Sequence, residues 1–141
     1  GYAAAFRGST EAALESAAQG RAFVSALAAG WPDLAVRSEA GTEPAYPCVV
    51  GAAAGLGGIP LPDAVLAFLH AFATNLISAG VRLIPLGQRE GVRILAALAP
   101  VTAQAAAAAL GTELDDLGTA TLRVDLTMAR HETQHVRLFR S

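Results

Sequence analysis

The sequence contains no lysine and only one cysteine, one methionine and one tryptophan among its 141 residues. A single thiol, Cys48, cannot form an intramolecular disulfide, and it fits a reducing cytoplasmic compartment. All ten basic residues are scattered arginines, and the net charge is -2. This charge argues against sequence-independent binding to nucleic acid, because such binding draws its affinity from many basic contacts to phosphates.

The beginning of the chain lacks a basic segment followed by a long apolar run, so we expect no signal peptide. The first residue is Gly1 rather than Met, which leads us to expect an upstream part. Residues 64–81 carry no charge over nearly the length of a membrane span, but His70, Thr74 and Asn75 interrupt them. We therefore predict a buried core helix and no membrane association.

Apolar residues recur at helical spacing, and convincing strand alternation is absent. Proline and glycine separate the helical patterns, which predicts one all-α domain over residues 1–141 with about five to seven helices. The helix opened by Pro62 should be the central and most buried one, and Pro100 should kink or divide the helix that follows it. Residues 31–45 indicate an exposed connection between helices. The predicted helices cover 10–29, 47–56, 62 to the stop at Pro85, 88–110 and about 124–132, with a short turn at 114–117.

The segment His131–His135 matches the zinc-protease pattern, in which two histidines four residues apart flank a glutamate general base. Such a site needs a third protein ligand. Only six residues follow His135, and none is His, Asp, Glu or Cys, so His70 would have to supply the ligand. We favour an exposed polar C-terminal tail at residues 133–141 and keep a zinc-type metallohydrolase that uses His131, Glu132 and His135 as the alternative.

Other local patterns have structural interpretations. Gly51 and Gly55 lie four residues apart, which predicts close helix packing. His70 sits in an apolar segment and is interpreted as a hydrogen-bonded core histidine. The adjacent Asp115 and Asp116 would diverge on a helix, so they indicate capping or a partner contact rather than acid–base catalysis.

The end of the chain carries a more specific signature. Residues Met128–Gln134, followed by Arg137–Ser141, closely resemble the C-terminal signature of the urease accessory protein F family. Similar segments occur in the family's order at Gly80–Gln88, at Asp115–Ala120 and, more weakly, at Gln19–Phe23. This resemblance covers most of the chain.

Two positions depart from the family pattern. His135 stands where the family usually has a tyrosine, so the His-Glu-Thr-Gln run needs no second histidine. The Gly-Tyr-Ser-containing N-terminal region of the family is absent, which indicates that the N-terminal part of the family fold is missing.

The resemblance implies an all-helical, non-catalytic scaffold that couples an accessory GTPase to apo-urease while the nickel metallocentre is incorporated. The implied partners are accessory protein D (or H), the GTPase called G and apo-urease, and a homodimer stays open. Nickel would pass through the complex, with no tightly bound cofactor. A generic helical interaction domain is the remaining alternative. The residues assigned to partner binding are Arg82, Pro85, Gly87, Gln88, Asp116, Gly118, Arg130, His131, Glu132, Thr133, Gln134, Arg137, Leu138, Phe139, Arg140 and Ser141.

Overall fold

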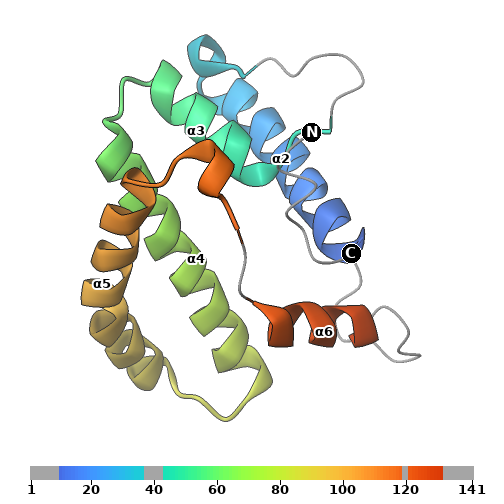
Figure 1. Cartoon of the computed structure of the whole chain (residues 1–141), viewed down its shortest axis with the longest axis vertical. Coiled ribbons are helices and arrows are strands. Elements are labelled where there is room, and N and C mark those ends of the chain that lie inside the picture. The colour runs from blue at the N-terminus through green and yellow to red at the C-terminus, as the bar shows by residue number, and fades with distance from the viewer. Residues whose placement is uncertain (1–9, 37–42, 119–120, 132–141) are drawn as a thin grey trace. The chain divides into compact units, whose positions relative to one another are not determined.

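The computed structural model describes residues 10–36, 43–118 and 121–131 (Figure 1). Within these ranges the chain is helical and contains no strand, which confirms the all-α prediction. Most predicted helix ends agree with the observed ones to within two residues. The α-helices are α2 (Thr10–Gly30), α3 (Tyr46–Leu56), α4 (Leu61–Leu83), α5 (Gln88–Leu110) and α6 (Leu122–His131), and two short 3-10 helices, η1 (Pro32–Leu34) and η2 (Leu114–Asp116), lie between them.

The chain divides into two compact units. Unit 1 joins the residues up to Gly57 to those from Leu117 onward, and it contains α2, α3 and α6. Unit 2 is Gly58–Asp116 and contains α4 and α5. The single-domain organisation stays a prediction.

In unit 1, α2 packs against α3 (Figure 1). The backbone just before and at the start of α3 lies close to α2 at Gly20. A Cβ atom at Gly20 would lie only 1.9 Å from the carbonyl oxygen of Pro44, so only glycine fits. One helical turn away, the Tyr46 N–H donates a hydrogen bond of 3.2 Å to the buried Ser16 Oγ. The rings of Phe23 and Tyr46 meet edge to face at 5.8 Å. These contacts fix the start of α3 on α2.

The prediction of close packing at Gly51 and Gly55 was wrong. A Cβ atom added at either position would meet no described atom within 4 Å. The tight approach in unit 1 occurs at Gly20 instead, because the loop before α3 crosses α2 there. A four-residue spacing of glycines identifies one helix face, but it does not show whether another element lies on that face.

In unit 2, α4 and α5 form an antiparallel hairpin (Figure 1). Pro62 and Asp63 suit the first turn of α4, because proline needs no helical N–H partner and the carboxylate favours the positive end of the helix dipole. The two helices approach each other closely at Gly91. A Cβ atom there would lie 3.2 Å from a methyl carbon of Ile77 and of Val81.

The prediction that α4 is the most buried helix was wrong. Ala73 is its one buried residue, whereas Phe72 and Leu76 are 56% and 59% exposed. The helix is apolar on most of its circumference, and α5 covers one side of it. His70 is exposed as well, so it is not a core histidine. Both α4 and α5 are long and apolar enough to cross a membrane by length and composition, which are properties that core helices of soluble proteins share.

The helix α5 continues through Pro100 to Leu110, so Pro100 does not divide it. The kink expected at Pro100 stays a prediction. A proline inside a helix removes one backbone hydrogen bond, and here the residue lies on the exposed side. Gly111 forms the C-cap, as predicted, and its N–H donates to the Ala108 carbonyl at 3.1 Å.

Candidate partner-binding surfaces

The structure distributes the sequence-predicted binding residues over three places. Arg82, Pro85, Gly87 and Gln88 lie at the tip of the α4–α5 hairpin. Asp116 ends η2 and Gly118 follows it, both exposed. Arg130 and His131 end α6. The remaining predicted residues, Glu132, Thr133, Gln134, Arg137, Leu138, Phe139, Arg140 and Ser141, lie outside the described residues, as does His135.

The hairpin tip contains a half-open groove of about 340 Å³ between α4 and α5. Its walls include Ile77 and Val81 from α4 and Val92 and Leu95 from α5. Polar side chains, among them those of Arg82 and Gln88, also line it. The groove therefore combines apolar walls with a cationic group, and it contains two residues that the sequence assigned to partner binding.

The Arg82 guanidinium makes no ion pair with any residue that the structure describes, and neither does that of Arg89 in the first turn of α5. The nearby Arg93 does make one, from Nη1 to the Glu90 Oε2 at 3.3 Å. Gly87 provides no side-chain hydrogen bond to cap the N-terminus of α5. Among the described residues, the tip thus presents two arginines without a carboxylate counter-ion, Arg82 in the last turn of α4 and Arg89 in the first turn of α5.

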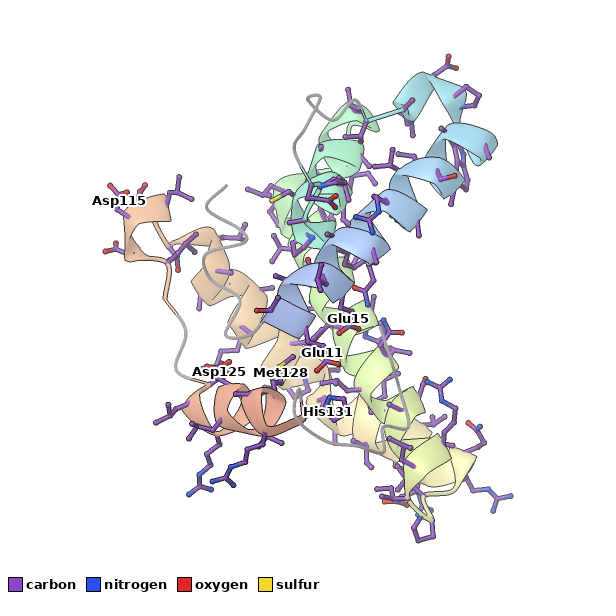
Figure 2. All side chains as sticks on the ribbon, turned by 90° about the vertical axis from the view of Figure 1, so that its right-hand side faces the viewer. Glu11, Glu15, Asp115, Asp125, Met128 and His131 are labelled. Carbon is purple, nitrogen blue, oxygen red and sulfur yellow. The ribbon has the colours of Figure 1, made fainter. Side chains whose placement is uncertain are left out.

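A second arrangement joins the C-terminal end of α6 to the start of α2 within unit 1. The Nδ1 atom of His131 lies 2.9 Å from the Oε2 atom of Glu11, although 120 residues separate them (Figure 2). Their side chains are 34% and 16% exposed. An ionised Glu11 accepts a hydrogen bond from Nδ1–H, and the attraction is strongest when the imidazole is protonated.

This contact gives His131, which the sequence placed near the end of a predicted helix, a partner that the sequence did not indicate. The residue is the last one of α6, and it packs against an acidic residue of another helix. No pattern within the sequence could have identified Glu11 as the partner, because helix spacing says nothing about contacts over 120 residues. His131 is the one member of the apparent zinc motif that the structure describes, so the metallohydrolase hypothesis depends on the sequence pattern alone. Within residues 10–36, 43–118 and 121–131, no group of three His, Cys, Asp or Glu side chains could hold a metal ion.

The two aspartates after α5 lie in the exposed η2 turn, where the Asp116 N–H donates to the Glu113 carbonyl at 3.1 Å. Their side chains are on the surface. This position leaves Asp116 accessible to a partner, and it suits the carboxylates as solvated charges.

Comparison of the sequence with known proteins identifies the family of this chain. The family model named UreF matches residues 1–99. The chain belongs to the UreF family. It is 50% identical over 142 residues to the urease accessory protein UreF of Rhodopseudomonas palustris strain TIE-1, and the aligned part covers 99% of this chain and 59% of that relative.

A second relative, the urease accessory protein UreF of Bradyrhizobium sp. strain ORS 278, is 48% identical over 147 residues, again covering 99% of this chain and 59% of the relative. The chain thus spans about three-fifths of the length of the curated UreF relatives that it matches. The recognition made from the sequence motifs is confirmed. The family match includes the hairpin tip, and the relatives' alignments extend over the C-terminal signature.

Proposed function

We propose that this UreF-family chain acts as a non-catalytic scaffold in urease maturation and couples the accessory GTPase to apo-urease during nickel insertion. The relatives that this chain matches are named urease accessory proteins, which supports this proposal. Nickel is the cargo of this reaction rather than a resident cofactor. The proposed partners are accessory protein D (or H), the GTPase and apo-urease, in the cytoplasm, without nucleic acid or membrane, and a homodimer stays open.

The observation that carries this proposal is the amount of exposed apolar surface. In the described residues most of the buried hydrophobic positions are alanines, whereas large side chains such as Trp31, Phe72 and Leu76 are more than half exposed. Phe72 and Leu76 are four residues apart on α4, so they share one face of that helix and offer apolar surface to another polypeptide. A scaffold whose surface is covered by several partners needs such surface, and it needs no arrangement of catalytic groups.

The predicted docking of the C-terminal tail belongs to this proposal. Leu138 and Phe139 stand between Arg137 and Arg140, which is an apolar anchor with flanking charges. Aromatic and Arg side chains are enriched among the residues that dominate interface energies. We propose that this tail docks onto accessory protein D or H.

The test is a pull-down of the tagged chain from cells that express the complete urease operon. We expect accessory protein D (or H) and the GTPase to be recovered with it. A chain that ends at Val136 should keep its melting temperature and lose the D or H protein. A lower melting temperature with normal partner recovery would show that the tail packs on its own domain instead.

The same preparation separates the alternatives. One tightly bound metal ion per chain would favour the metallohydrolase if the His135→Tyr variant loses that ion. The proposed scaffold should tolerate His135→Tyr, because this change introduces the residue that the family usually has. If neither a partner protein nor a metal is recovered with the chain, the remaining alternative is a generic helical interaction domain.

A further inference from the structure

The charges of the α4–α5 hairpin are separated between its two ends. At the tip, residues 82–93 contain three arginines and one glutamate. At the opposite end, Asp63 begins α4, and Glu113, Asp115 and Asp116 follow α5. The middle of the hairpin carries no charge between these two groups. The positive potential is therefore confined to the tip, where the groove lies.

The shape of the groove suits a helix. Ile77 and Val81 are four residues apart on α4, and Val92 and Leu95 are three apart on α5, so each pair forms a ridge along its own helix. Gly91 also lines the groove, and because it has no side chain, a methyl group of Ile77 and one of Val81 lie close to α5 there. An apolar ridge of a third helix fits between two such ridges.

We infer that the hairpin tip is a docking site for an acidic amphipathic helix of a partner protein, an inference that rests on the proposed scaffold function. The apolar ridge of that helix enters the groove and covers Val92, which is 67% exposed in this chain. Its Asp or Glu side chains face the guanidinium groups of Arg82 and Arg89, which have no counter-ion among the described residues. Complementary charge at the rim of an apolar contact gives specificity and a fast association rate.

Charge also decides against a basic or neutral occupant. A basic helix would be repelled by the two guanidinium groups, and a purely apolar helix would leave them without partners while removing water from around them. A carboxylate-bearing helix satisfies both groups, and Arg can bind a carboxylate through two parallel hydrogen bonds.

The test measures binding of the purified chain to purified accessory protein D (or H), to the GTPase and to apo-urease by biolayer interferometry. We expect the chain to bind at least one of them, and we expect Arg82→Glu/Arg89→Glu to weaken that binding at least tenfold. Raising the salt concentration from 0.05 to 0.5 M should weaken the unsubstituted chain similarly and affect the double variant much less. Val92→Gln should weaken binding about threefold, because it removes apolar contact without changing the charge.

Arg123→Glu is the matched control, since it makes the same charge change at an exposed position of α6 in unit 1. It should leave the affinity within twofold of that of the unsubstituted chain, whereas Arg82→Glu alone should not. Circular dichroism of every variant must show unchanged helical content, which the exposed positions of the substituted residues favour.

Different failures overturn different statements. Binding that is unchanged in the double variant, or weakened equally by Arg123→Glu, overturns the docking site and leaves the scaffold function intact. Absence of binding to all three proteins overturns the scaffold function and the docking site with it. Two further results overturn the choice of occupant. One is self-association of the unsubstituted chain in analytical ultracentrifugation that is absent in the double variant. The other is binding to phosphatidylserine vesicles that requires Arg82 and Arg89, while binding to the three proteins does not.

Discussion

The two compact units are stabilised in different ways. Unit 1 depends on contacts between residues far apart in the sequence, such as Gly20 against Pro44, Ser16 with Tyr46, and Glu11 with His131. Unit 2 is a hairpin whose helices follow one another directly and meet through apolar side chains. In unit 1 a close backbone contact and a buried hydrogen bond each depend on the position of individual atoms. In unit 2 the apolar side chains between the helices can shift slightly to accommodate a substitution. Unit 1 should therefore be more sensitive than unit 2 to small substitutions.

The largest expected effect is that of Gly20→Ala. The new Cβ would lie 1.9 Å from the Pro44 carbonyl oxygen, so the loop before α3 must move away from α2. We expect the free energy of unfolding to fall by about 2 kcal/mol, after allowing for the better helix propensity of alanine. Urea denaturation followed by circular dichroism measures it. The control is Gly51→Ala, which meets no described atom within 4 Å and should be neutral or slightly stabilising. Equal effects of the two substitutions would contradict the close contact.

A smaller loss is expected for Ser16→Ala. This change removes the buried Oγ that accepts the hydrogen bond from the Tyr46 N–H, which links α2 to the start of α3. We expect a destabilisation of about 1 kcal/mol. Thermal denaturation measures it, and Ser25→Ala, at an exposed position of the same helix, is the control. A melting temperature that is the same for both variants would show that the hydrogen bond contributes nothing.

His131→Ala should act locally. Loss of the contact with Glu11 releases the end of α6, and a partly exposed pair of this kind contributes up to about 1 kcal/mol. Amide hydrogen exchange in α6 should therefore become up to about fivefold faster, while the melting temperature of the chain hardly changes. His70→Ala, at an exposed position of α4, should leave exchange in α6 unaffected. Unchanged exchange in His131→Ala would mean that the contact does not hold α6.

The smallest effect is expected for Gly91→Ala, which places a Cβ atom 3.2 Å from the methyl carbons of Ile77 and Val81. Side-chain methyl groups can shift by a few tenths of an ångström, and alanine gains up to about 1 kcal/mol of helix propensity over glycine. We expect a net change within about 0.5 kcal/mol, measured by urea denaturation. A loss as large as that of Gly20→Ala would remove the contrast between the two units.

Part of the candidate site was accessible from the sequence. The motif Gly80–Gln88 coincides with the hairpin tip, and Arg82 and Gln88 do line the groove there. Arg89 was missed, because it lies just beyond the motif and only its missing counter-ion among the described residues marks it. Glu11 was missed for another reason, since its partner lies at the far end of the chain.

The sequence by itself determined where the helices begin and end and to which family the chain belongs. Both are local properties, because Pro62 and Gly111 act on the backbone of their own turns and the family motifs are read residue by residue. Only the tertiary structure decided which faces are covered. In the tertiary structure α4 is mostly exposed, and the loop before α3 lies close to α2 at Gly20 while nothing lies against Gly51 among the described residues. Glu11 and His131, far apart in the sequence, are in contact. Burial and long-range contacts depend on which elements lie opposite one another, and helical periodicity identifies a face without identifying its neighbour.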